Sequence, residues 1–193
     1  MAVSPPLHEP GQVMLFSGHM IDAPDRPAPR FPAAAEPVAA RAIADVLRVF
    51  DAGPADLAVT SGACGGDLLF CEAVLARGVP LELFLPFEPP VFAVKSVDFA
   101  GADWHRRFEA VCRAAGRIHV ARAADGVDPY EHTNLRMLAA AQAHGAEKVR
   151  FVCLWDGRGG DGPGGTAHMA QQVREAGGQT HWLDTTSLWE LPR

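Results

Sequence analysis

The stretch Lys148–Gly178, KVRFVCLWDGRGGDGPGGTAHMAQQVREAGG, decides the fold. It reads as a buried strand over Val149–Trp155, a glycine-rich loop over 157–166 and a helix that begins near Thr166. Glycines let a backbone approach a ligand closely because they carry no Cβ. The first turn of a helix leaves N–H groups unpaired, and the helix dipole favours an anion there. Strand, loop and helix together predict a phosphate-binding site in an α/β domain.

The rest of the chain repeats this alternation of strand and helix. Short apolar runs predict further strands over Val13–Gly18, Leu57–Gly62, Leu81–Pro86, Ile118–Ala121 and Thr180–Asp184. Helical periodicity lies between them, over Pro37–Phe50, Asp67–Arg77, Trp104–Ala115 and Tyr130–His144. The strands read as apolar on both faces, which is typical of a parallel sheet covered on both sides. The expected fold is α/β: one doubly wound, Rossmann-like domain over 1–193, with a mostly parallel sheet of about six strands and helices on both faces.

Three segments do not follow this alternation. Residues 1–11 read as a loose N-terminal arm. The proline-rich segment His19–Pro37 cannot form a regular helix, because prolines lack N–H donors and restrict the residues before them. Residues 87–103 read as an irregular flap.

Composition limits the class of protein. The chain has 193 residues, of which 48% are hydrophobic and 21% charged, as expected for a soluble globular domain. The net charge of −6 argues against a duplex-DNA binder with a large basic face, although a local basic pocket stays open. No apolar run reaches the roughly 18–20 residues of a membrane span, and the N-terminus does not read as a secretory signal. A protein without membrane contact is therefore expected.

The cysteines Cys64, Cys71, Cys112 and Cys153 match no paired CxxC metal site. Cys112 and Cys153 fall inside apolar patterns, where a buried thiol is expected. We therefore expect reduced cysteines and a cytoplasmic protein, while the even count leaves a disulfide open.

Three predicted strands end in small residues. These ends are Ser17-Gly18-His19, Ser61-Gly62-Ala63 and the 157–166 loop. Ligands of parallel sheets bind beyond the carboxyl ends of the strands, so the three turns predict one ligand site at that edge. None of the turns is a GxGxxG fingerprint or a GxxxxGK[ST] loop, and tight chain reversal is the alternative explanation of each.

Several side chains near these turns could contact a ligand. Thr166 is the expected N-cap of the last helix, and its hydroxyl could also donate to a phosphate oxygen. Asp67 opens the second helix, where it complements the dipole or accepts from ribose hydroxyls or a base edge. Arg30 and Arg136 could neutralise phosphate, although lone surface arginines are usually only solvated. Glu72 lies about 140° around the helix from Asp67, so the two do not form one site.

Histidines and a tryptophan complete the candidates. His19 follows a strand-end glycine and could face a ligand, and His168 lies in the first turn of the last helix. No HExxH or similar pair occurs, so no metal site is expected. Trp155 could stack on a base or lie in the interior.

Two further motifs carry a family resemblance. The segment TSGACGGDLLFCEAVLARGVPLELFLP, residues 60–86, looks like the SLOG superfamily pattern. GPGGTAHM, residues 162–169, is similar to the PGGxGTxxE motif of the Lonely-guy phosphoribohydrolases, once called lysine decarboxylases. FSGHMIDAP, together with PRFP, resembles the start of uncharacterised bacterial SLOG-type proteins. The resemblance spans roughly residues 13–185.

The resemblance implies a Rossmann-like fold that binds nucleotides or their derivatives, often as a homodimer. By position, Gly164, Gly165 and Thr166 match the phosphate-binding residues, and Gly62, Gly66 and Asp67 match the turn after the second strand. Arg136 loosely matches an arginine of the enzymes. The enzymes' catalytic glutamate lies three positions after the threonine, where this chain has Met169. A thioether cannot act as a general acid, so the activity of that family is not carried over.

We therefore expect a module that binds a nucleotide or nucleotide-derived ligand, without cofactor or metal, and works as a sensor. The alternative is a phosphoribohydrolase in which Asp67, Glu72 or a loop acid replaces the missing glutamate. A third interpretation is an interaction module with a vestigial pocket. The expected ligand-binding residues are Ser17, Gly18, His19, Arg30, Ser61, Gly62, Gly66, Asp67, Arg136, Gly164, Gly165 and Thr166.

Overall fold

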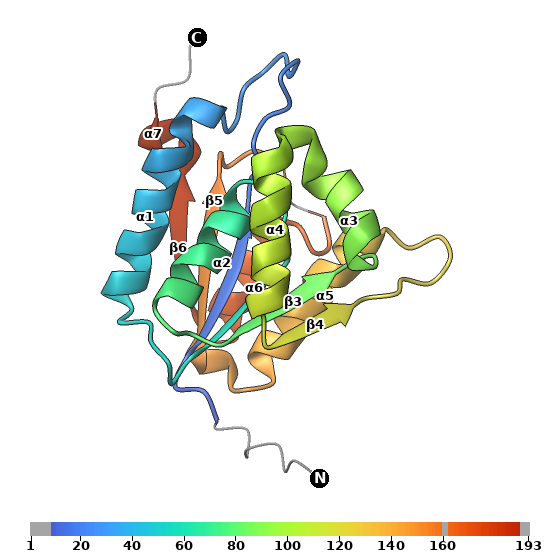
Figure 1. Ribbon diagram of the computed structural model, residues 1–193. Coiled ribbons are helices and arrows are strands. Elements are labelled where there is room, and N and C mark those ends of the chain that lie inside the picture. The colour runs from blue at the N-terminus through green and yellow to red at the C-terminus, as the bar shows by residue number, and fades with distance from the viewer. Residues whose placement is uncertain (1–8, 160–161, 190–193) are drawn as a thin grey trace.

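The computed structural model of the chain describes residues 9–159 and 162–189, and its strands form one parallel sheet (Figure 1). The strands are β1 Val13–Gly18, β2 Leu57–Thr60, β3 Leu81–Leu85, β4 Arg117–Val120, β5 Val149–Trp155 and β6 Gln179–Asp184. Their order in the sheet is β4-β3-β2-β1-β5-β6, and every neighbouring pair is parallel. The strand order reverses between β1 and β5, as in doubly wound sheets. The predicted Rossmann-like α/β fold is confirmed.

Helices cover both faces of this sheet. In Figure 1, α1 (Glu36–Val49), α2 (Gly66–Ala76) and α4 (Ala102–Ala114) lie in front of it, with α3 (Pro89–Ser96) beside α4. Behind it lie α5 (Pro129–Gln142) and α6 (Thr166–Glu175), and the short α7 (Thr185–Leu188) follows β6. Three 3-10 turns, Ala33–Ala35, Asp98–Ala100 and Ala146–Lys148, join the elements. Within the described residues, no helix combines the length and the apolar character that crossing a membrane requires.

The central strands are buried on both faces. Met14 and Phe16 of β1 face the core under α1, α2 and α4, whereas Val13 and Leu15 face the core under α5 and α6. All four side chains have no exposed surface. The edge strands differ: Trp182 of β6 is 50% exposed, and no residue of β4 is fully buried. The expectation of strands apolar on both faces therefore holds for the centre of the sheet and is wrong at its edges.

All four cysteines are free thiols, so the alternative of a disulfide is wrong. Cys64, Cys71 and Cys153 are buried, while Cys112, expected to be buried, is only partly so. Burial raises the pKa of the Cys64 thiol to about 12 and that of Cys112 to about 11. These thiols are packing groups rather than nucleophiles.

The expectation of an irregular flap over 87–103 is wrong, because α3, a 3-10 turn and the start of α4 occupy this segment. Pro89 and Pro90 stand at the first positions of α3, where a missing N–H leaves no hydrogen bond unmade. Phe92, Ala93 and Ser96 then form its buried face. The boundaries of the other predicted elements agree within one or two residues.

The proline-rich segment contains no regular helix before Ala33, as predicted. It is the blue loop that rises at the top of Figure 1. One oxygen of Asp22, Oδ2, accepts hydrogen bonds from the backbone N–H groups of Arg30 and Phe31 at 2.8 and 2.9 Å. The ring of Phe31 is buried and stacks on Trp189 at 5.1 Å. Most of the predicted loose arm, residues 1–8, lies outside the described residues.

Candidate ligand site at the carboxyl edge of the sheet

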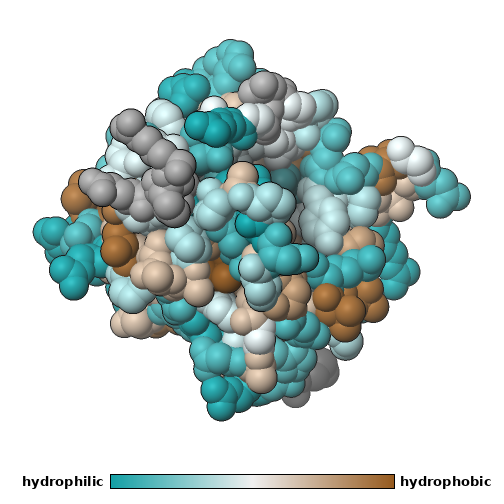
Figure 2. Space-filling view, turned by 90° about the horizontal axis from the view of Figure 1, so that it is seen from above, coloured by the Kyte–Doolittle hydropathy of each residue, from teal (hydrophilic) through white to brown (hydrophobic). Residues whose placement is uncertain are grey.

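A small cavity of about 150 Å³ lies where β1 and β2 end, between α3 and α5. Figure 2 looks onto this edge of the molecule, most of which carries hydrophilic residues. The cavity brings together four of the predicted ligand residues: Ser17, Gly18, Ser61 and Asp67. Its remaining lining comes from Phe16, Met20, Ala63, Phe92, Ser96, Tyr130, Asn134 and Met137. We refer to it as the Asp67 cavity.

Asp67 is the one acidic residue of this lining, and its carboxyl group is half satisfied. The residue is 6% exposed and lies in the first turn of α2. Its Oδ2 accepts from the backbone N–H groups of Gly62 and Ala63, both at 3.3 Å, whereas Oδ1 is buried without a partner. Burial raises the pKa of Asp67 to about 6, against the opposing effect of the backbone N–H groups of Gly62, Ala63 and Gly18. A buried polar atom without a partner costs about 1–3 kcal/mol, so Oδ1 is an unsatisfied acceptor within the lining of the cavity.

The glycines that precede Asp67 serve chain packing. Gly65 has a φ of +97°, and a Cβ there would lie 2.5 Å from the backbone N of Ile21. A Cβ on Gly66 would lie 3.2 Å from the Phe16 ring and 3.3 Å from the Cα of Gly18. These glycines let the chain that leaves β1 cross the start of α2. Gly66, a predicted ligand residue, is therefore placed behind the cavity and not in its lining.

The N-terminus of α2 has little capacity left for an anion. Gly66 N donates to the carbonyl of His19 at 3.0 Å, and Leu68 N donates to the carbonyl of Ala63 at 3.2 Å. Just before the helix, Cys64 N donates to the carbonyl of Ser96 at 2.9 Å. The backbone donors that could cradle a phosphate at this turn are largely used within the fold.

Two helices that sequence reasoning did not connect with the site form its other walls. Tyr130, Asn134 and Met137 stand at positions i, i+4 and i+7 of α5, so they share one face. The hydroxyls of Ser96 and Tyr130 lie 3.3 Å apart and join α3 to α5. The spacing of these three residues in the sequence was the signal that could have indicated a shared helix face. Arg136, the residue predicted on this helix, lies off that face, is exposed and does not line the cavity.

The glycine-rich loop after β5 reaches the cavity wall but does not line it. Residues 160 and 161 lie outside the described part of the chain. Gly164 has a φ of +73°, and a Cβ there would lie 2.7 Å from the carbonyl oxygen of Glu131 on α5. The Asn134 side chain donates to the Gly164 carbonyl at 3.0 Å, and Gly164 N donates to Nδ1 of His168 at 3.1 Å. Asn134 therefore belongs to the cavity wall and to the loop contact at once.

The prediction of Thr166 as the N-cap of α6 is wrong. The N-cap is Gly165, whose backbone is extended at φ −69° and ψ 161°, and Thr166 is the first helical residue. No side chain caps this end. The start of α6 thus keeps uncapped N–H groups beside the glycine loop, which is the arrangement expected near an anion.

His19 and Asp156 pair where the strand order reverses, after β1 and β5. Asp156 N donates to Nε2 of His19 at 3.2 Å, and its Oδ1 lies 3.3 Å from the same nitrogen. Burial lowers the pKa of His19, as does the nearby Arg30, while Asp156 opposes both. Nε of Arg30 is buried without a partner. Neither His19 nor Arg30 belongs to the cavity lining.

Neither Glu72, considered as a replacement acid, nor Met169, which stands in place of the motif's glutamate, lines the cavity. Glu72 forms a two-bond ion pair with Arg107 of α4, at 2.7 and 2.8 Å. Met169 is fully buried in the core beneath α5 and α6. The position that aligns with the glutamate of the PGGxGTxxE motif is therefore a packing position in this chain.

The tryptophan at the end of β5 is tied to the neighbouring strand and loop. Trp155 donates its ring N–H to the carbonyl of Arg158 at 3.1 Å, and its own carbonyl accepts from the Trp182 ring at 2.8 Å. Its side chain is partly buried, so it is neither a fully interior residue nor a freely exposed ring that could stack on a base.

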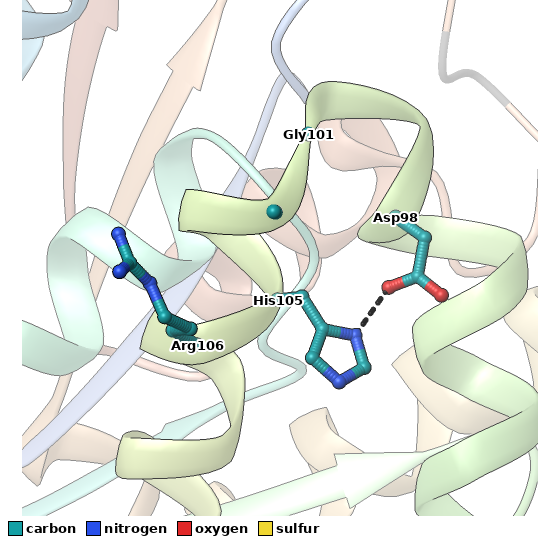
Figure 3. Close-up of a pocket in the computed structure, with 5 residues that line it drawn as sticks. Asp98, Gly101, His105 and Arg106 are labelled. Carbon is teal, nitrogen blue, oxygen red and sulfur yellow. Dashed lines mark hydrogen bonds and ion pairs between the residues drawn. The ribbon is translucent and has the colours of Figure 1, made fainter.

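A larger, open cleft of about 500 Å³ lies at the start of α4 (Figure 3). Asp98 and His105 point toward one another there, with Nδ1 of His105 at 2.7 Å from the carboxylate. This hydrogen bond raises the pKa of His105. Arg106 points away from this pair and binds Asp103 at 2.6 Å. Each charged side chain of the cleft has a partner, so the cleft has no unsatisfied group comparable with Asp67.

The described residues contain no cluster of three or more metal-binding side chains.

The chain was compared with known proteins. No protein-family model and no curated protein matches it. Among solved structures it is similar to DNA processing protein A (DprA) from Streptococcus pneumoniae, with a TM-score of 0.50 and 12% sequence identity. The match covers 90% of this chain and 50% of that one, so the chain spans about half the length of DprA. A likeness at this identity shows the fold, which agrees with the Rossmann-like sheet.

Proposed function

We propose that this protein binds a nucleotide or nucleotide-derived small molecule at the carboxyl edge of its sheet and acts as a sensor or regulatory module. The observation that carries the proposal is the buried Oδ1 of Asp67, which has no partner and belongs to a cavity at the ends of β1 and β2. Doubly wound sheets bind ligands at this edge. The resemblance to SLOG-type proteins supports the same ligand class and adds the expectation of a homodimer.

The proposed site has two parts. The Asp67 cavity is one, and the uncapped start of α6 with Gly164, Gly165 and Thr166 is the other. Asn134 lies between them, because it lines the cavity and donates to the Gly164 carbonyl. A nucleotide has a ring system and a phosphate, which such a divided site can hold at separate points.

A thermal-shift panel of AMP, ADP, cyclic AMP, NAD and ADP-ribose tests this function. A ligand at 100 times its dissociation constant should raise the free energy of unfolding by about 2.7 kcal/mol. Thr166→Val should weaken the response to phosphate-bearing ligands. Thr180→Val, on β6, is the matched control, because its hydroxyl only contacts the Ala170 carbonyl at 3.4 Å. If no member of the panel at millimolar concentration shifts the transition, the proposed function is rejected.

The alternative is a phosphoribohydrolase that uses Asp67 as its acid. The raised pKa of Asp67, about 6, favours this candidate because a general acid works best when its pKa lies near the working pH. Incubating AMP with the protein and measuring free adenine by chromatography separates the two functions. A sensor releases no free adenine from AMP. A hydrolase releases adenine, and the Asp67→Asn variant should lose this activity. An interaction module with a vestigial pocket would show neither binding nor release.

A further inference from the structure

We propose that the Asp67 cavity takes the uncharged, hydrogen-bond-donating part of the ligand, either the ribose hydroxyls or an amino group of the base, and leaves the phosphate outside. The inference rests on the proposed function, because it divides the same ligand between the two parts of the site. It assigns Asp67 as the residue that recognises the nucleoside by accepting a hydrogen bond from it.

The charge of the lining excludes phosphate from the cavity. Its twelve residues include no lysine, arginine or histidine. The acidic residue Asp67 is itself without a cationic partner, since only backbone N–H groups oppose the effect of its burial. A phosphate in the same small, partly dry space would lie beside a carboxylate, and like charges at such distances repel strongly.

The backbone gives the same result. A phosphate bound without cationic side chains needs several free N–H groups, usually at a helix N-terminus. At the start of α2 the N–H groups of Cys64, Gly66 and Leu68 donate to Ser96, His19 and Ala63 carbonyls. Those of Gly62 and Ala63 donate to Asp67. Of the N–H groups from Gly62 to Leu68, only those of Gly65 and Asp67 have no acceptor in the described part of the chain, so this end of the cavity offers few backbone donors for a phosphate.

What the cavity offers fits a ring that carries donors. Oδ1 of Asp67 is an open acceptor, and the hydroxyls of Ser17 and Ser61 can accept or donate. Phe16, Phe92 and Met137 supply apolar surface against which a ring can lie. The volume of about 150 Å³ is below the roughly 300–1,000 Å³ of sites that bury a drug-sized ligand, so one ring fits and a whole nucleotide does not.

Calorimetric titration with defined probes tests this division. Wild-type protein should bind both adenosine and AMP. An analogue that lacks the hydroxyl or amino group bound by Asp67 should bind at least about tenfold more weakly than adenosine, as expected for a lost hydrogen bond to a carboxylate. Loss with 2′- or 3′-deoxyadenosine assigns the contact to ribose, and loss with purine riboside, which lacks the amino group, assigns it to the base. Inorganic phosphate should not compete with adenosine.

Two variants at matched positions complete the test. Asp67→Asn should weaken adenosine binding by at least about tenfold and abolish the discrimination among the analogues. Glu72→Gln makes the same carboxyl-to-amide change on the same helix, where the side chain binds Arg107, and should bind adenosine like the wild type. Should Asp67→Asn fail to fold, Ser61→Ala takes its place with a smaller expected loss.

The outcomes separate the two proposals. Nucleotides that bind wild type and Asp67→Asn equally, or phosphate that displaces adenosine, overturn the inference and leave the nucleotide-binding function intact. Absence of binding by every nucleoside and nucleotide overturns both.

Discussion

Two glycine-rich turns follow central strands of the sheet, and they are built differently. In the turn after β2, residues 62–67, a Cβ on Gly65 would lie 2.5 Å from the backbone N of Ile21. In the loop after β5, a Cβ on Gly159 or Gly162 would have nothing within 4 Å. The first turn uses glycine because another chain segment crosses it. Glycine content therefore does not locate the polar centre of the site, which is the unpaired oxygen of Asp67.

The largest expected effect comes from adding a methyl group to each turn. Gly65→Ala combines a left-handed φ with a backbone clash, so we expect the free energy of unfolding to fall by about 4 kcal/mol. Gly162→Ala has open space and should change it by less than about 0.5 kcal/mol. Urea denaturation measures both. Equal costs would mean that the two turns do not differ in packing.

The acid of the first turn should make stability depend on pH. The pKa of Asp67 is raised from 3.8 to about 6, so the folded protein favours the protonated carboxyl. Its contribution to stability is full below pH 4 and is lost as the pH rises through 6, a change of about 3 kcal/mol.

Asp67→Asn removes this titration. The difference in unfolding free energy between variant and wild type should therefore grow in favour of the variant between pH 4 and 7. Urea denaturation at several pH values measures it, and a constant difference would show that the carboxyl group is not buried unpaired.

A third, smaller effect concerns Gly164, which has the tightest contact among the described glycines of the second turn. Gly164→Ala meets the Glu131 carbonyl at 2.7 Å and has a φ of +73°. We expect a loss of about 2 kcal/mol, less than at Gly65, because a surface loop can move away from α5. Calorimetric melting measures the loss. A cost as large as that of Gly65→Ala would mean that the loop is as constrained as the turn after β2.

The smallest effect is expected at the start of α6. Thr166 is not the N-cap, so Thr166→Ala should cost less than about 0.5 kcal/mol. Asp128 caps α5 through a 2.7 Å bond from Glu131 N, so Asp128→Ala should cost about 1 kcal/mol. Thermal melts of both variants compare them directly. A larger loss at Thr166 than at Asp128 would restore a structural role for its hydroxyl.

The fold was predictable because its signals are local. Apolar runs such as Val13–Gly18 and Val149–Trp155 are strands in the structure with the same bounds. The segment over 87–103 was expected to be irregular, whereas Pro89 and Pro90 begin a helix there. The exposure of β4 and β6 was missed because the sequence of a single strand does not show whether that strand lies at the edge of the sheet.

The site was predictable only in part, because it depends on contacts between distant segments. Ser17, Ser61 and Asp67 meet because parallel strands end at one edge. That Gly66 serves a chain crossing follows only once the segment after β1 is seen over α2. Tyr130 and Asn134 were visible as a helical stripe, but the sequence does not say which face of that helix looks into a cavity.

The hydrogen bond from Asn134 to Gly164 has a mechanical consequence. One side chain touches the cavity and also holds the segment from which α6 starts. A ligand that draws the Asn134 amide toward itself must stretch or break this bond. Occupancy of the cavity would then loosen the contact between α5 and the start of α6. Ligand binding in the cavity would in this way be coupled to a movement of α6.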